Sequence, residues 1–237
     1  DIRDKKSMSS IFNNYQINSI IHFASLKSVD ESVLNPKLYE DNNVYGAKVL
    51  IDLAKEFAIS KFIFSSSACV YGEPNFTPLN EDHQLNPINP YGKNKVDIET
   101  LLLNDSYFGS QCCTKILRYF NPIGAYAKGV IGENSKGIPK NLMPNILGVV
   151  NNLISVLNIY GSDYDTVDGT AIRDYIHIMD LIEAHFLALE DNSPDIKIFN
   201  VGTGRGYTVL EIIKTFERVN NISIPLNFLP RREGDVG

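Results

Sequence analysis

Short apolar runs alternate with segments of helical periodicity along the first half of the chain, and this alternation limits the possible folds more than any other feature. Residues 20–24, 62–64 and 115–120 are largely apolar runs of strand length. Residues 42–57, between the first two runs, place their apolar side chains on one helical face. Strands that are apolar along their whole length are typical of parallel sheets covered by helices on both faces. The pattern therefore predicts an α/β protein with a doubly wound parallel sheet.

The rest of the chain predicts further elements and a second, smaller domain. We expect helices near residues 8–15, after Tyr91, at 142–156, ending at 189 and at 208–216, and a further buried strand at 198–202. Thr208, followed by Glu211 three residues later, is the expected N-cap of the last helix. We predict a first domain at 1–122, to which residues 174–202 return, and a second domain at 123–237.

A tyrosine and a lysine at helical spacing, Tyr91 and Lys95, are the first candidates for chemistry. Side chains four residues apart lie on the same face of a helix. A free tyrosine has a pKa near 10, but a lysine charge about 4 Å away contributes roughly 4 kcal/mol at an effective dielectric of about 20. We therefore expect Lys95 to lower the pKa of Tyr91 toward about 7, where the phenol can accept a proton. The alternative is a surface pair, which is the commoner origin of this spacing.

The position of Ser67 favours a functional site over a surface pair. Ser67 closes the run 64–67, at the carboxyl end of a predicted strand, and Tyr119 lies at the corresponding end of another. In open parallel sheets, ligands bind beyond the carboxyl ends of the strands. Ser67 is therefore placed to hold the hydroxyl whose proton Tyr91 removes.

Composition excludes several classes of function. The net charge of −6 argues against nucleic acid, because a phosphate backbone requires a basic protein face. The three cysteines and four histidines show no metal-ligand spacing, so we expect no metal site and reduced thiols, as in a cytoplasmic protein. No apolar run reaches the roughly 18 residues of a membrane helix.

Four motifs, together with Ser67, Tyr91 and Lys95, point to one family. They are LRYFNPIGA at 117–125, GIPKNLMP at 137–144, DGTAIRDYIH at 168–177 and PRREGD at 230–235. With these motifs the chain resembles the UDP-glucose 4-epimerases, which belong to the extended short-chain dehydrogenases/reductases, over essentially its whole length. The resemblance implies a Rossmann-like fold, bound NAD, an isomerase of galactose metabolism in the cytoplasm, and a homodimer without membrane or nucleic-acid partners.

The same resemblance assigns roles residue by residue. It makes Ser67, Tyr91 and Lys95 catalytic. It implies that the cofactor is bound by Asp1, Ile2, Phe23, Ala24, Ser25, Leu26, Lys27, Asn42, Tyr91, Lys95, Tyr119 and Phe120, with Ser25 where the family has a glycine. It implies that the UDP-sugar is bound by Ser67, Asn121, Asn141, Leu142, Asn158, Ile159, Tyr160, Arg173, Arg232 and Asp235. The simpler alternatives are that Asn42 caps a helix, that Arg173 pairs with Asp168 or Asp174, and that Tyr119 and Phe120 are core residues.

The implied reaction interconverts UDP-galactose and UDP-glucose through a 4-keto sugar. Tyr91 removes the 4-hydroxyl proton while NAD takes the hydride from C4, and the sugar then turns over before the hydride returns. Another NAD-dependent nucleotide-sugar epimerase or a dehydratase is the alternative enzyme, although a dehydratase requires an acidic pair where this chain has Ala68 and Cys69. A protein that binds NAD and sugar nucleotide without catalysis is the alternative outside enzymes.

The glycine-rich turn that opens a dinucleotide-binding fold is missing from the expected position. The glycines at 202, 204 and 206 follow a late strand, and we interpret them as a tight turn. We therefore expect the sequence to be an internal piece, truncated at both ends. By itself, this piece is expected to lack tightly bound NAD and activity.

Overall fold

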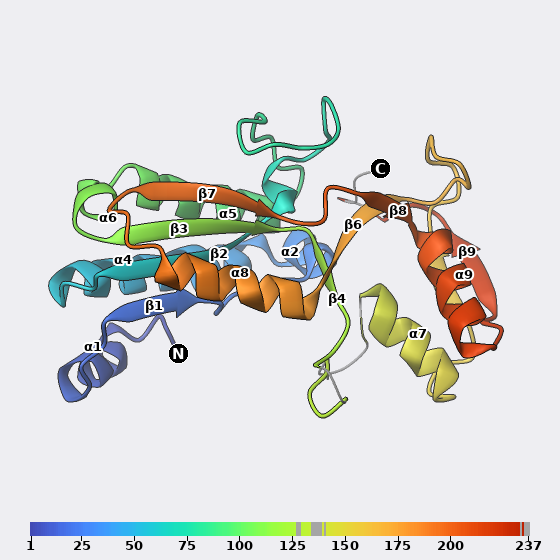
Figure 1. The fold of residues 1–237 in the computed structure, drawn as a ribbon, viewed down its shortest axis with the longest axis horizontal. Coiled ribbons are helices and arrows are strands. Elements are labelled where there is room, and N and C mark those ends of the chain that lie inside the picture. The colour runs from blue at the N-terminus through green and yellow to red at the C-terminus, as the bar shows by residue number, and fades with distance from the viewer. Residues whose placement is uncertain (127–128, 134–138, 140, 233, 235–237) are drawn as a thin grey trace. The chain divides into compact units, whose positions relative to one another are not determined.

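The computed structural model describes residues 1–126, 129–133, 139, 141–232 and 234. The chain divides into two compact units, and each unit is assembled from two separate stretches of sequence. Unit 1 comprises Asp1–Tyr119 and Ile182–Val201, and unit 2 comprises Phe120–Leu181 and Gly202–Gly237. Each unit has its own strands (Figure 1). Each also has its own hydrophobic core. The assignment of cofactor and substrate domains stays a prediction.

Unit 1 is a parallel α/β sheet, as the alternation of apolar runs and helices predicts. Its elements are α1 (Lys5–Asn14), β1 (Ser19–His22), α2 (Val29–Leu34), α3 (Pro36–Tyr39), the π-helix η1 (Glu40–Tyr45), α4 (Gly46–Glu56), β2 (Lys61–Ser67), the 3₁₀ helix η2 (Ala68–Val70), α5 (Pro90–Leu103), α6 (Ser106–Ser110), β3 (Cys113–Tyr119), most of α8 (Ile178–Glu190) and β7 (Ile196–Val201). The strand order is β1-β2-β3-β7, and every neighbouring pair is parallel. Figure 1 shows the four strands side by side, with α4 and α5 behind the sheet and α8 in front.

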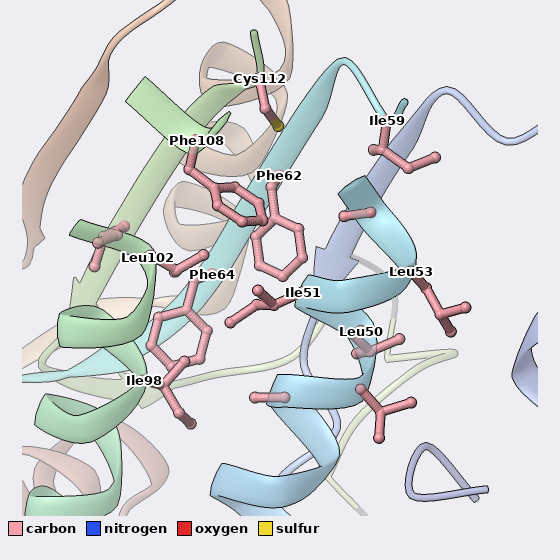
Figure 2. Close-up of a cluster of buried hydrophobic side chains, with 14 of the residues drawn as sticks. Leu50, Ile51, Leu53, Ile59, Phe62, Phe64, Ile98, Leu102, Phe108 and Cys112 are labelled. Atoms are coloured by element: carbon pink, nitrogen blue, oxygen red, sulfur yellow. The ribbon is translucent and has the colours of Figure 1, made fainter. Parts of the chain in front are cut away.

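Side-chain alternation along the strands explains how the sheet is covered on both faces. Phe62 and Phe64 of β2 lie on the face that packs against α4, α5 and α6, where Ile98 and Phe108 complete a wholly buried cluster (Figure 2). The rings of Phe62 and Phe108 meet edge to face at 5.4 Å between centroids. Ile63, which points to the opposite face, is equally buried. A strand with two buried faces must be apolar throughout, which is why the sequence pattern was informative.

The helix that carries the tyrosine–lysine pair begins at a well-defined cap. Asn89 is the N-cap of α5, and its side-chain oxygen accepts a hydrogen bond from the backbone N–H of Gly92 at 2.8 Å. Pro90 occupies the first helical position, where its missing N–H costs nothing. Gly92 allows close packing, because a Cβ there would lie 2.6 Å from the backbone oxygen of Cys69. The start of α5 is thereby held against the loop that follows β2.

The described part of unit 2 contains a three-stranded sheet, a two-stranded sheet and the helices α7 and α9. Its elements are β4 (Asn121–Ile123), α7 (Leu142–Val150), β5 (Leu157–Tyr160), β6 (Ile172–His177), β8 (Gly206–Thr208), α9 (Val209–Asn220) and β9 (Leu226–Leu229). Strands β4 and β6 are parallel, β6 and β8 are antiparallel, and β5 and β9 are parallel. Its core is formed by Ile146 of α7, Ile213 of α9 and their apolar neighbours.

Two predictions about unit 2 have different outcomes. The capping box of α9 is confirmed: Thr208 Oγ1 accepts from the backbone N–H of Glu211 at 3.1 Å, and the Glu211 carboxylate accepts from the N–H of Thr208 at 2.7 Å. The predicted helix at 142–156 is too long, because α7 ends at Val150 and Asn152 adopts a left-handed conformation with a φ of 57°. The last residues of the predicted helix instead belong to a loop.

Among the described residues, no helix is both long enough and apolar enough to cross a membrane.

Candidate active site

The catalytic candidates of α5 form a column on the buried side of the helix. Lys95 is 2 % exposed, and its ammonium donates a 2.7 Å hydrogen bond to the backbone oxygen of Ser65 in β2. The Lys95 Nζ atom lies 5.5 Å from the ring centroid of Tyr91 and 5.0 Å from that of Phe64. The predicted helical pairing of Tyr91 with Lys95 is therefore present, but it is not a surface pair. An ammonium has three protons, so Lys95 retains capacity to bind further oxygen atoms.

Ser67 lies where the sequence places it, at the carboxyl end of β2. It is 8 % exposed, and its hydroxyl oxygen accepts from the backbone N–H of Cys69 at 3.2 Å. The side chains of Ser67 and Tyr91 share a hydrogen bond. The structure thus brings Ser67, Tyr91 and Lys95 together at the strand ends, from three positions spread over 29 residues of sequence.

The protonation of this group differs from the expectation. Burial raises the pKa of Tyr91 above its ordinary value, because a buried phenolate loses its hydration. The predicted lowering by Lys95 is therefore wrong for the protein alone, where desolvation is the larger effect. Burial also lowers the pKa of Lys95 to about 8, partly offset by the neighbouring Cys69 and Glu99. In the protein alone, Tyr91 is a neutral phenol near neutral pH and Lys95 is close to its midpoint at mildly alkaline pH.

The predicted cofactor stretch, residues 23–27, continues from the carboxyl end of β1. Its conformation is held by Asn43, a wholly buried residue of η1 that sequence analysis did not single out. The Asn43 amide accepts from the backbone N–H of Leu26 at 2.8 Å and donates to the backbone oxygen of Leu26 at 3.0 Å. Asn42, the predicted residue, donates to the Asn43 side chain at 3.0 Å and does not cap a helix, whereas Ser25 donates to the Leu26 oxygen. Fixing the peptide groups of this stretch is what a backbone-lined cofactor wall requires.

An aromatic group at the ends of β1 and β3 contains a second residue that sequence analysis missed. Tyr119 closes β3, and its hydroxyl forms a hydrogen bond with Nε2 of His185 from α8. The His185 ring also packs against Phe23, with 4.9 Å between centroids. Burial raises the pKa of Tyr119 to about 12, so this hydroxyl stays protonated. Two predicted cofactor residues, Phe23 and Tyr119, are thereby joined through His185.

The first two predicted cofactor residues lie beside α4 and η1. The Asp1 carboxylate accepts from the Arg3 guanidinium at 2.6 Å, and Arg3 also pairs with Asp41 of η1. Ile2 packs so closely on α4 that a Cβ on Gly46 would lie 2.5 Å from its Cδ1 atom. Ile2 is half-buried and Asp1 is exposed, so an acidic side chain is presented beside an apolar one.

Two arginines of unit 2 stack on tyrosines. The Arg232 guanidinium lies 3.8 Å from the ring centroid of Tyr160, so two predicted substrate residues are in contact. Arg231, which was not predicted, lies 4.0 Å from the ring of Tyr164 and forms an ion pair with Asp163 at 2.8 Å. Stacking leaves the edge of a guanidinium available for a planar bidentate partner such as phosphate. Among the described residues, Arg231 thus has a carboxylate partner, and no such ion pair is seen for Arg232.

The remaining predicted substrate residues occupy different positions in unit 2. Arg173 of β6 donates a hydrogen bond to the backbone oxygen of Ile172 at 2.6 Å. The carboxylate of the next residue, Asp174, accepts hydrogen bonds from the backbone N–H groups of Thr203 and Gly204 at 2.7–2.9 Å. The predicted glycine turn therefore closes around a carboxylate of its own unit, and Gly204 adopts a φ of 73°.

The remaining predicted residues differ in how far their side chains are exposed to a ligand. Asn121 is exposed at the start of β4, Phe120 is half-buried and precedes it, and Asn141 precedes α7 and donates to Glu133 at 3.1 Å. Leu142 and Ile159 pack in the core of unit 2. Ile159 is 2 % exposed, so its side chain is a core residue and only its backbone is left to contact a ligand. Asn158 is exposed and pairs with Asn227 of β9, and Asp235 lies outside the described residues.

Comparison with known proteins assigns the chain to a family. Residues 1–202 match the NAD dependent epimerase/dehydratase family. The chain belongs to this family. It is 46% identical to the UDP-glucose 4-epimerase of Haemophilus influenzae and 43% identical to that of Bacillus subtilis, in both cases over the whole chain and about 70% of the relative (71% and 70%). It superimposes on the solved UDP-glucose 4-epimerase of Bifidobacterium longum in complex with NAD+ and UDP with a TM-score of 0.96 and 42% identity, covering 100% of this chain and 71% of that one.

These similarities confirm the predicted family and the α/β fold with its parallel sheet. They leave the individual site residues as predictions, which the geometry above makes specific. Within the part of the chain that the structure describes, no group of three or more His, Cys, Asp or Glu side chains is arranged to hold a metal ion.

Proposed function

We propose that this protein is a UDP-glucose 4-epimerase, an isomerase that interconverts UDP-galactose and UDP-glucose with bound NAD. The observation that carries this proposal is the buried arrangement of Ser67, Tyr91 and Lys95 at the carboxyl ends of the parallel strands, in a member of an NAD-dependent epimerase family. Relatives of this name match the whole chain at 43–47% identity.

The strand ends of unit 1 fit a dinucleotide. The backbone of the stretch 23–27 is held at Leu26 by Asn43, and Phe23 and Tyr119 both contact His185. We assign cofactor contacts to residues 23–27, to Asn42, and to the Asp1–Ile2 pair at the adenine. Bound NAD would supply a hydride acceptor for C4 of the hexose and a positive charge.

The protein's own residues handle the proton. Ser67 holds the 4-hydroxyl oxygen of the sugar, and Tyr91, to which Ser67 is hydrogen-bonded, removes its proton. Burial alone keeps Tyr91 protonated, so the phenolate form depends on positive charge close to the ring. Lys95 provides that charge from 5.5 Å, and its own pKa of about 8 means that this support is lost as the pH rises through that value.

The nucleotide part of the substrate is assigned to unit 2. We propose that Arg173 and Arg232 bind the diphosphate, that Tyr160 holds Arg232 in place by stacking, and that Asn121, Asn141 and the backbone at 158–159 bind the remaining UDP oxygens. Guanidinium groups match phosphate oxygens in charge and in planar geometry. Gripping the UDP while leaving the hexose loosely held allows the sugar to present either face to the hydride acceptor.

The test is conversion of UDP-galactose by the full protein, followed by chromatographic detection of UDP-glucose. We expect conversion without added reductant or oxidant, because the hydride that leaves C4 returns to it. The Tyr91→Phe variant is expected to lower kcat roughly 10²–10⁴-fold with UDP binding nearly intact. Normal turnover in that variant would contradict the role of Tyr91, and the absence of conversion by the unaltered protein would contradict the proposed function.

We also propose that the protein acts as a homodimer in the cytoplasm. Both follow from the resemblance to this family. Analytical ultracentrifugation at micromolar concentration tests the dimer, and a single species of monomer mass would contradict it. Fractionation of cells that express the tagged protein tests the location.

A further inference from the structure

A buried carboxylate continues the catalytic column by one more helical turn. Glu99 follows Lys95 by four residues on α5 and is 1 % exposed. Its carboxylate accepts from Arg118 of β3 at 3.1 Å (Nε) and 2.7 Å (Nη2), and from the hydroxyl of Ser66 at 2.5 Å. Residues four apart lie above one another on a helix, so Glu99 stands on the face that carries Tyr91 and Lys95.

Three consecutive serines connect this column to β2. The backbone oxygen of Ser65 accepts from Lys95, the hydroxyl of Ser66 donates to Glu99, and the hydroxyl of Ser67 is bonded to Tyr91. Each residue of the serine run therefore meets a different residue of α5. This pattern fixes both the rotation of the helix and its position along the strand, because a shift in either would break several of these bonds together.

The Glu99–Arg118 pair is anchored beyond the helix. Arg118 donates to the hydroxyl of Tyr71 at 2.9 Å and to the backbone oxygen of Glu81 at 3.0 Å, and the Tyr71 hydroxyl donates to Asn200 of β7 at 2.6 Å. Arg118 is 2 % exposed, so both charges of the pair are removed from water. A buried ion pair contributes little to net stability, but losing one partner leaves an uncompensated buried charge and is strongly destabilising. Such a pair specifies position more than it stabilises the fold.

Several titratable or charged groups surround Lys95 among the described residues. Cys69 after β2, Tyr91 and Glu99 on α5 and His22 at the end of β1 lie near it, and Arg118 of β3 is ion-paired with Glu99. Burial and Lys95 lower the pKa of His22 to about 4, so His22 is neutral at physiological pH. Tyr91 is a neutral phenol in the protein alone. Glu99 is the carboxylate of this set, and it is ion-paired with Arg118 at 2.7 Å.

We propose that Glu99 is a positioning residue for the reaction assigned above: its carboxylate holds α5 in register with the serine run and supplies the negative charge that balances the Lys95 ammonium. This inference rests on the proposed function, because its purpose is to keep the Tyr91–Lys95 pair competent. Glu99 reaches neither substrate nor cofactor in this scheme. It acts through Lys95.

Removing the charge of Glu99 has a consequence that a purely structural role does not. Without this negative neighbour, the pKa of Lys95 falls below its value of about 8. A fall of about one unit lowers the charged fraction of Lys95 roughly fivefold at pH 8 and hardly at all at pH 6. The deficit in turnover therefore grows with pH, whereas a general loosening of the fold lowers turnover at every pH.

The experiment compares pH profiles of kcat for UDP-galactose conversion by the full protein. Glu99→Gln is expected to move the alkaline limb about one unit toward lower pH, with KM changed less than about twofold. Glu99→Asp retains the charge and is expected to restore the limb. Asp97→Asn is the matched control, since it removes a carboxylate from the same helix two residues away, off the catalytic face, and is expected to match the unaltered protein.

Two further variants keep the test decisive if Glu99→Gln folds poorly. Glu99→Gln combined with Arg118→Gln leaves neither member of the ion pair without its partner. It is expected to keep a limb shifted toward lower pH, by less than Glu99→Gln alone because the positive charge of Arg118 is removed as well. Ser66→Ala removes one hydrogen bond of Glu99 but no charge, so its limb is expected to stay in place. If the unaltered protein is active and the alkaline limb is unshifted both in Glu99→Gln and in the double variant, the role of Glu99 is overturned and the proposed function stands. If the unaltered protein is inactive, the proposed function itself is overturned.

Discussion

Replacing Asn43 with alanine is expected to destabilise the protein by about 2–3 kcal/mol. The lost amide makes two hydrogen bonds to the backbone of Leu26, at 2.8 and 3.0 Å, and each such bond contributes about 1 kcal/mol net. Asn43 is wholly buried, so the truncated side chain also leaves unfilled space. Leu26 is half-buried, so water replaces part of the lost bonding and keeps the estimate below the full cost of two unsatisfied groups.

Thermal unfolding followed by circular dichroism measures this loss. At roughly 2–4 °C per kcal/mol for a domain of this size, we expect Tm to fall by about 4–12 °C. Asn42→Ala is the matched control: Asn42 is half-buried and donates one bond, to Asn43 itself, so its loss should cost less than about 1 kcal/mol while lowering NAD affinity more. An unchanged Tm in Asn43→Ala, or equal losses in the two variants, would refute this reasoning.

Three further predictions concern Arg232, Lys95 and Thr208. Arg232→Ala is expected to weaken UDP binding at least tenfold by calorimetry, whereas Arg231→Ala, whose guanidinium pairs with Asp163, should weaken it far less; equal losses would contradict the assignment. Burial lowers the pKa of Lys95 from 10.5 to about 8, so the unfolded state binds more protons than the folded state between these pH values. The free energy of unfolding should therefore rise with pH from about 8 to 10.5. This rise should disappear in Lys95→Met, and a rise of equal size in that variant would show that another group is responsible. Thr208→Ala should cost about 1 kcal/mol in urea unfolding, and a stability within error of the unaltered protein would show that the capping box of α9 is dispensable.

Much of unit 1 could be predicted because its signals are local. A strand with two buried faces is apolar at every position, as in the run around Phe62 and Phe64, and a helix places Tyr91 and Lys95 on one face whatever lies beside it. The parallel arrangement follows from the alternation of strands with helices, and it puts the carboxyl ends of β2 and β3 at one edge. Ser67 and Tyr119 were found at that edge for this reason.

Unit 2 was less predictable because most of its strands are only three or four residues long. The predicted helix at 142–156 followed a continuous apolar pattern, but the left-handed Asn152 ends the helix early. Strands such as β5 and β9 pair across 69 residues, from Asn158 to Asn227, and neither has a strong pattern of its own. Pairing of this kind depends on which segments the fold brings together.

The sequence by itself determined the family, the parallel sheet, the column of Tyr91 and Lys95 on one helix, and the strand end that carries Ser67. The tertiary structure decided the protonation states of those groups. Burial, which no spacing encodes, reversed the expected direction of the Tyr91 pKa. Contacts between distant segments identified Asn43, His185 and the Glu99–Arg118 pair, whose partners lie 17, 66 and 19 residues away in the chain. Helical and strand periodicity fixes which side chains share a face, but desolvation and charge balance depend on everything packed against that face.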